Sequence, residues 1–243
     1  MESTTTEEHY HTGKRSEYDT AEGYYSEGYY FIGKRPKYET PKEKTARIIK
    51  ELNEGSYEET SIKIESSDYD EDYREKGIGD EEVMLLCGAL KDNPHINEIS
   101  LMLQNVGDEG AKALAKISAL KDIFIGYENI TALGGCALAQ SELTSLSIYG
   151  GHIFINQEDE EAEGGEEFID CLIKNKTIEK LELMNTYMDD NLLIKLIENT
   201  TTIKSLYLGR KDFKQELFRD LHISQEEIHI YADEEIVLFG ETE

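Results

Sequence analysis

The segment that decides the fold is INEISLMLQNVGDEGAKALAKI, residues 96–117. Its first, fourth and sixth residues are Ile96, Ile99 and Leu101, an L-x-x-L-x-L spacing typical of a strand in a repeat unit. We take Asn105 as the asparagine of the following turn, where a side-chain amide satisfies backbone groups. A glycine and a run of acidic residues then open an alanine-rich helix, since negative charge is favoured at a helix N-terminus. The segment therefore predicts a strand, a turn and a helix.

The same pattern recurs along the chain. The first consensus positions of the predicted strands are Glu59, Ile96, Leu120, Leu143, Ile178, Ile203 and Gln225. The intervals are 37, 24, 23, 35, 25 and 22 residues, and we interpret the two long ones as a normal unit plus an insertion. Strand alternation places in the core the apolar pairs Ile62/Ile64, Ile99/Leu101, Ile123/Ile125, Leu146/Ile148, Leu181/Leu183, Leu206/Leu208 and Ile228/Ile230.

These units resemble leucine-rich repeats of the ribonuclease-inhibitor type over roughly residues 57–231. The resemblance implies an α/β fold: a right-handed βα horseshoe arc with a parallel sheet on the concave face and helices on the convex face. It also implies a protein partner bound to the concave face. The turns of the other units depart from the asparagine pattern, so we expect irregular turns in the later repeats. The short array and the glutamates near residue 243 also resemble some effectors that intracellular bacteria inject into host cells.

The sequence divides into segments of different composition. The first segment contains seven of the 15 tyrosines and few aliphatic residues, which predicts an arm that is flexible or docked. Alternatively, its GYYFIG stretch forms a strand or hairpin that covers the open end of the repeats. Thr40 and Glu43 form a capping box around Pro41, which predicts an N-terminal cap helix. The predicted segments are the arm (1–39), the cap helix (40–56), the repeats (57–231, with insertions near 66–77 and 151–163) and a C-terminal cap strand with an acidic tail (232–243).

Helices are expected after each strand, where apolar residues recur at helical spacing. Their predicted ranges are 80–91, 108–117, 131–140, 165–175, 189–199 and 213–220. After the last repeat strand we expect a turn at 232–234 and a return strand at 236–239.

The charge of the chain restricts its partners. Acidic residues outnumber basic ones by 52 to 25, a formal net charge of -27. Nucleic acids and acidic membranes would be repelled, whereas a protein with a basic patch would be attracted. The first residues are too polar for a secretory signal, and no apolar run is long enough to span a membrane. The three cysteines lie in apolar helical contexts, so we expect buried reduced thiols in a cytoplasmic protein: Cys87, Cys136 and Cys171.

No motif for catalysis, phosphate binding or a cofactor is present in the sequence. Asp68, Asp70 and Asp72 have the spacing that begins a calcium loop, but Tyr73 and Gly79 occupy the positions that need glycine and glutamate. We therefore predict no metal site, no cofactor and no enzymatic activity. The alternative is an enzyme or modifier whose chemistry resides in the tyrosine-rich arm.

The predicted binding site lies on the concave face of the sheet. Large apolar side chains alternate with the core pairs in adjacent repeats, and a contiguous apolar patch of this kind marks an interaction site. These residues are Met102, Phe124, Tyr149, Met184 and Tyr207. Both insertions leave the same end of the strands, which predicts an acidic rim made by Asp68, Asp70, Asp72, Glu158, Asp159, Glu160 and Glu161.

Overall fold

The computed structural model shows two compact units, Met1–Glu39 and Thr40–Glu243. The residues that the structure describes are 23–26, 29–32, 39–65, 77–102, 104–126, 129–150, 152–154, 164–184, 188–210, 227–232 and 235–239.

The first unit contains a short β-hairpin. Strands β1 (Gly23–Ser26) and β2 (Tyr29–Ile32) pair antiparallel, with Tyr25 opposite Tyr30. The tyrosine pairs favour this arrangement, because aromatic side chains suit a pleated strand. GYYFIG therefore contains a strand, as its composition indicates, whereas the flexible or docked state of the arm stays a prediction.

The second unit begins with helix α1 (Pro41–Glu54). The Thr40 hydroxyl accepts a hydrogen bond from the Glu43 backbone N–H at 3.2 Å, and the Glu43 carboxylate accepts one from the Thr40 N–H at 2.9 Å. This reciprocal capping box satisfies two donors at the helix start. Ile48 and Leu52 are buried, so α1 covers the apolar end of the repeat core.

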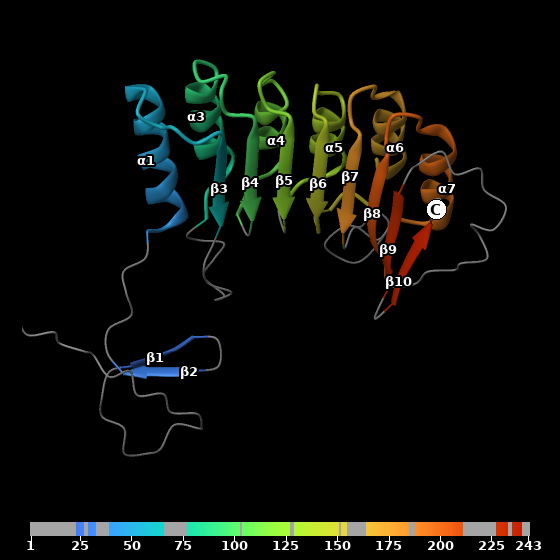
Figure 1. Ribbon diagram of the computed structural model, residues 1–243, viewed down its shortest axis with the longest axis horizontal. Coiled ribbons are helices and arrows are strands. Elements are labelled where there is room, and N and C mark those ends of the chain that lie inside the picture. The colour runs from blue at the N-terminus through green and yellow to red at the C-terminus, as the bar shows by residue number, and fades with distance from the viewer. Residues whose placement is uncertain are drawn as a thin grey trace, which may run out of the picture. The chain divides into compact units, whose positions relative to one another are not determined.

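Seven parallel strands and one antiparallel strand form a single sheet, shown in Figure 1. The strands lie side by side in chain order, which is the topology of a solenoid in which each unit pairs with the next. The parallel strands are β3 (Ser61–Glu65), β4 (Glu98–Met102), β5 (Asp122–Gly126), β6 (Ser145–Tyr149), β7 (Lys180–Met184), β8 (Ser205–Arg210) and β9 (Glu227–Ala232), and β10 (Glu235–Phe239) closes the edge antiparallel to β9.

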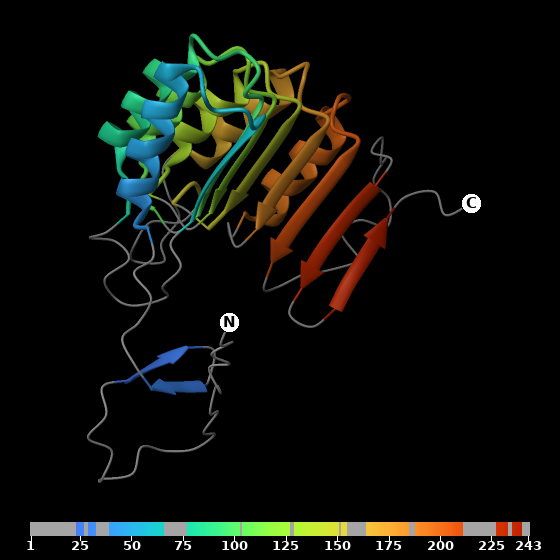
Figure 2. The ribbon, with the colours of Figure 1, turned by 60° about the vertical axis from the view of Figure 1, so that its left-hand side comes forward.

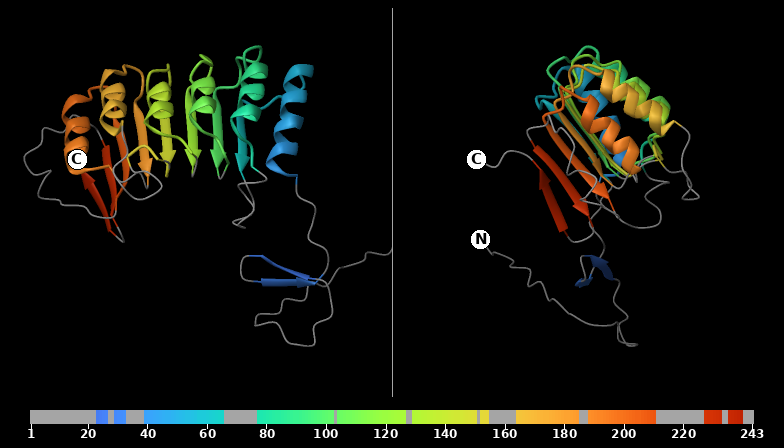
Figure 3. Two further views of the ribbon diagram at one scale, coloured as in Figure 1. Left: turned by 180° about the vertical axis from the view of Figure 1, so that it is seen from behind. Right: turned by 90° about the vertical axis from the view of Figure 1, so that its right-hand side faces the viewer.

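The helices between the strands cover one face of this sheet and leave the other face open, as Figures 2 and 3 show. They are α3 (Asp80–Leu90), α4 (Asp108–Leu114), α5 (Ala132–Ala139), α6 (Gly165–Lys174) and α7 (Asp190–Asn199). The predicted leucine-rich-repeat solenoid is thus confirmed, and five predicted helices are present, each slightly shorter than expected. The helix predicted at 213–220 lies outside the described residues.

The core consists of the apolar pairs that the strand pattern predicts. The register places Ile99 opposite Ile123 and Leu181 opposite Leu206, in step with the sequence repeat. The strand residues of these pairs whose burial is described are 0–1% exposed. Full burial of such a side chain contributes about 1.5–3 kcal/mol, so the buried pairs of each strand stabilise every unit of the solenoid.

The turn after β4 corrects one prediction. Gln104, 1% exposed, accepts a hydrogen bond from the Ile78 N–H at 2.8 Å and donates one to the Met102 carbonyl at 2.7 Å. Asn105 is only half-buried, and its side chain accepts a hydrogen bond from the Asn129 amide. The amide that satisfies buried backbone groups is therefore that of Gln104, because the ninth consensus position counted from Ile96 is residue 104.

Aspartates connect successive helices at their N-termini. Asp80 Oδ1 accepts hydrogen bonds from the N–H groups of Gly107 and Gly110 at 2.7 and 2.9 Å, across the gap from α3 to α4. In the next unit, Asp108 Oδ1 accepts from the N–H groups of Thr131 and Gly134, at 2.9 and 3.0 Å. Each carboxylate therefore caps the helix of the following unit, where the exposed N–H groups and the helix dipole favour negative charge.

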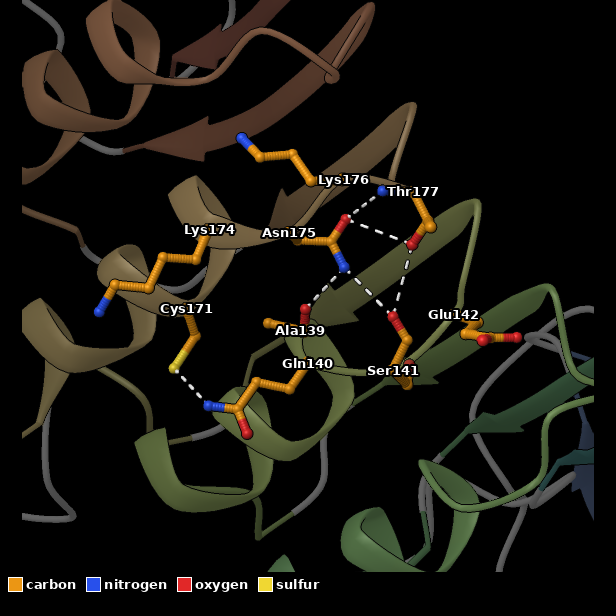
Figure 4. A pocket seen from close by; sticks show the side chains of 9 residues that line it. All are labelled: Ala139, Gln140, Ser141, Glu142, Cys171, Lys174, Asn175, Lys176 and Thr177. Atoms are coloured by element: carbon orange, nitrogen blue, oxygen red, sulfur yellow. Dashed lines mark hydrogen bonds between the residues drawn. The ribbon is translucent and has the colours of Figure 1, made fainter.

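A buried asparagine connects units at the opposite end of the helices. Asn175 Nδ2 donates to the Ala139 carbonyl at 2.8 Å, and its Oδ1 accepts from the Thr177 and Ile178 N–H groups at 2.7 Å each. Figure 4 shows this side chain inside a hollow of about 310 Å³. Because its amide is committed to backbone groups, this hollow is a structural joint between α5 and α6.

The cysteine prediction is wrong for two residues. Cys136 of α5 and Cys171 of α6 are joined in a disulfide, with their Cα atoms 5.5 Å apart. They are 35 residues apart in the chain, but adjacent helices of the solenoid bring them together. Cys87 is a free, buried cysteine, and burial raises the pKa of its thiol to about 12.

Candidate functional site

The open face of the sheet presents the residues that alternate with the buried pairs. The register places these residues in rows across the strands, so side chains from adjacent units lie next to each other. One row is Ser61, Glu98, Asp122, Ser145, Lys180 and Ser205; the next is Lys63, Ser100, Phe124, Ser147, Glu182, Tyr207 and His229; the third contains Glu65, Met102, Gly126, Tyr149 and Met184.

Three of the predicted apolar residues gather around one glycine. The rings of Phe124 and Tyr149 lie 4.8 Å apart and are tilted by 56°. A Cβ atom on Gly126 would lie 3.1 Å from the Phe124 ring and 3.6 Å from the Met102 side chain. The missing side chain at position 126 thus lets the ring lie across the strand, next to Met102.

The other two predicted residues extend this surface in different ways. Met184 is the register neighbour of Tyr149 and is half-buried. Tyr207 stacks on the ring of His229 at 4.7 Å, and the Lys180 ammonium lies 5.5 Å from its ring centre. All five predicted residues are therefore half-buried on the open face. They do not form one continuous apolar row, because Glu182 lies between Phe124 and Tyr207 in the register. The role of the five residues in binding stays a prediction.

Glu182 is held by two donors. It accepts a hydrogen bond from the Tyr149 hydroxyl at 3.0 Å and forms an ion pair with Lys180 at 2.6 Å. The hydrogen bond to Glu182 raises the pKa of the Lys180 ammonium above its ordinary value. These contacts hold an aromatic side chain, a carboxylate and a cation in fixed positions at the centre of the face.

A hollow of about 260 Å³ lies on this face, and we call it the central groove. Of the five predicted residues, Phe124 alone lines it, so the groove is more polar than the alternation pattern suggested. Its lining residues are Lys63, Glu98, Ser100, Asp122, Phe124, Ser145, Ser147, Lys180 and Glu182.

The sequence pattern did not single out the floor of this groove. Ser145 and Ser147 are 9% and 4% exposed, although their side chains lie on the open face. Small residues in β6 between larger neighbours create the hollow. The signal was visible as serine at both positions of β6, whereas each of the strands β3, β4, β5, β7 and β8 carries a charged or aromatic residue in at least one of these two rows.

The acidic rim lies outside the described residues. Its members Asp68, Asp70, Asp72 and Glu158–Glu161 belong to the two insertions, and the rim stays a prediction. Among the residues that the structure describes, no three His, Cys, Asp or Glu side chains gather to hold a metal ion. Within the same residues, no helix is long and apolar enough to cross a membrane.

Comparisons with known proteins found similarity in solved structures. One is "Leiomodin-1 Actin-Binding Site 2 (ABS2)", at 19% identity and a TM-score of 0.47, covering 62% of this chain and 83% of that chain. Another is the tropomodulin C-terminal domain of Caenorhabditis elegans, at 14% identity and a TM-score of 0.45, covering 63% and 88%. No family model and no curated protein matches. These similarities concern the course of the backbone and not a binding partner.

Proposed function

We propose that this chain is a non-catalytic protein-interaction module that binds a protein partner through the open face of its sheet. The observation that carries the proposal is the contact between Phe124 and Tyr149, two half-buried rings on a face that no described helix covers. Tyrosine, phenylalanine and methionine are enriched at the centres of protein interfaces. In this proposal the acidic insertions attract a partner with a basic patch, since the chain carries a net charge of -27.

A peptide-display selection tests this proposal. Random peptides are selected on the full chain and screened again on the triple variant Phe124→Ala, Tyr149→Ala, Tyr207→Ala. We expect peptides that bind the wild type and lose binding to the variant, whose circular dichroism should be unchanged because these side chains lie outside the core rows. Added salt should slow association, because it screens charge attraction. Peptides that bind both proteins equally would contradict the proposed face.

The alternative is an enzyme or modifier whose chemistry resides in Met1–Glu39. Deleting residues 1–39 separates the two functions, since Thr40 begins a self-contained capped helix. Open-face binding should survive this deletion. A secreted effector acting on a host protein would use the same face, so the selection tests the binding face in that case as well.

A further inference from the structure

The central groove contains charges of both signs, and ion pairs neutralise its cations. Lys63 pairs with Glu65 at 2.9 Å, and Lys180 pairs with Glu182 at 2.6 Å. Glu98 and Asp122 form no ion pair within the part of the chain that the structure describes. The groove therefore presents two carboxylates outside these ion pairs, although the charge of Asp122 adds to the effect of the Glu182 hydrogen bond in raising the pKa of the Lys180 ammonium.

These two carboxylates lie directly beside each other. Glu98 of β4 and Asp122 of β5 are register partners, and like charges in such positions destabilise a sheet. Adjacent strands are about 4.8 Å apart, so one planar cation can reach both groups. This cost to the free protein would be removed by a bound cation.

The floor beside them offers unused hydrogen-bonding groups. Ser145 is the register partner of Asp122, and Ser147 is that of Phe124. Both serines are more than nine-tenths buried, and among the described residues their hydroxyls make no hydrogen bond. Both hydroxyls line the central groove, so they can donate or accept hydrogen bonds with a group bound there.

We infer that the central groove binds an arginine side chain of the protein partner. This inference rests on the proposed function and names the chemistry of its recognition. The guanidinium has five N–H donors in a plane, which suits Glu98, Asp122 and the Ser145 hydroxyl together. Its flat face stacks on Phe124, two residues after Asp122 on the same face of β5. Lys63 and Lys180 at the edges of the groove would repel a divalent ion more strongly than a delocalised monovalent one.

The test uses the full chain and Nα-acetyl-arginine methylamide, followed by amide NMR shifts. We expect saturable shifts at Asp122, Phe124 and Ser145–Ser147. The matched citrulline compound, which has the same shape and no charge, should produce none. The double variant Glu98→Gln, Asp122→Asn should bind roughly tenfold more weakly or worse, since charge-assisted hydrogen bonds are lost.

A matched variant removes the same charge from the helical face. Glu109→Gln with Glu166→Gln deletes two exposed carboxylates, which are 67% and 70% exposed, and should bind the arginine compound as the wild type does. Equal binding of arginine and citrulline compounds, or unchanged binding to the Glu98 and Asp122 variant, would overturn the inference.

The outcomes separate this inference from the proposed function. If the arginine compound leaves the groove unshifted while displayed peptides still need Phe124 and Tyr149, the inference fails and the proposed function stands. If the compound binds the groove but no displayed peptide depends on the open face, the arginine site stands and the proposed function fails.

Discussion

Helix α5 is joined to its two neighbours by different chemistry. On the α4 side, Gly134 lies so close to Asp108 that a Cβ atom would meet its Oδ1 at 2.5 Å, and the carboxylate accepts the Gly134 N–H. On the α6 side, Gly135 faces the ring of Phe168, and the Cys136–Cys171 disulfide links the helices. The α4–α5 joint is an electrostatic cap, whereas the α5–α6 joint combines a covalent bond, an apolar contact and, at the end of the helices, the Asn175 amide.

The difference shows how a solenoid distributes its stability. Each unit contacts its neighbours only, so stability is close to a sum of unit and interface contributions. The strand core is equivalent at both joints, and the chemistry that varies lies at the helices. The α4–α5 joint should depend on hydrogen bonds, whereas the α5–α6 joint should depend on redox conditions.

The largest effect is expected from the core, and it should be equal at both joints. Leu101→Ala and Leu181→Ala should each lower the free energy of unfolding by ~2–5 kcal/mol, because both side chains are 0% exposed and leave a cavity. Urea unfolding measures this difference. Leu133→Ala is the control, since Leu133 is 67% exposed and its loss should change stability by at most about 0.5 kcal/mol. Strongly unequal losses of unfolding free energy in the Leu101 and Leu181 variants would show that the units around β4 and β7 do not share one core.

Breaking the covalent joint should have the next largest effect. Replacing Cys136 and Cys171 together by serine should lower the free energy of unfolding by about 2–4 kcal/mol, as expected for a loop closed over 35 residues. Wild-type protein in reductant should match the double variant. Thiol titration of the unreduced, unfolded chain should find one free thiol, Cys87; three thiols and no effect of reductant would refute the disulfide.

The polar links should contribute less than the disulfide. Asn175→Ala removes the partners of buried backbone groups and should cost ~1–3 kcal/mol. Asp108→Ala removes a helix cap and should cost about 0.5–2 kcal/mol, part of which Asp108→Asn should restore because it keeps one oxygen. Thermal unfolding compares the three variants. If Asp108→Ala costs more than Asn175→Ala, the ranking of the two joints is wrong.

The smallest effect concerns Cys87 and appears with pH. Its thiol has a pKa of about 12 in the folded chain, whereas the pKa of an unfolded thiol is about 8.5. Above pH ~8.5 the unfolded state loses the proton that the folded state keeps, so stability falls by up to about 1.4 kcal/mol per pH unit. Below that pH the contribution is complete.

The measurement is unfolding at pH values from about 8.5 to 9.5. This window avoids Tyr57, whose pKa is raised by burial from 10.0 to about 12. Cys87→Ala should show a flatter dependence than the wild type. Identical slopes would mean that the buried thiol does not contribute to the alkaline loss of stability.

The sequence by itself determined the strands and their register. A period-two alternation fixes that the side chains of Ile99 and Leu181 lie on the buried face of the sheet. A shift of the register by one residue would place every core side chain on the solvent face. The rows of the open face followed from the same alternation, and the structure reproduces them. The capping box at Thr40 was equally local, because its donors and acceptors lie within four residues.

The tertiary structure alone decided what joins one unit to the next. The Cys136–Cys171 bond, the Asp108 cap on α5 and the Asn175 amide all connect residues 23 to 36 positions apart. The central groove likewise depends on the depth of Ser145 and Ser147 beneath the side chains of neighbouring strands. Strand alternation states which side of the sheet a residue occupies, but the size and pairing of its neighbours decide whether that side is a surface, a joint or a groove.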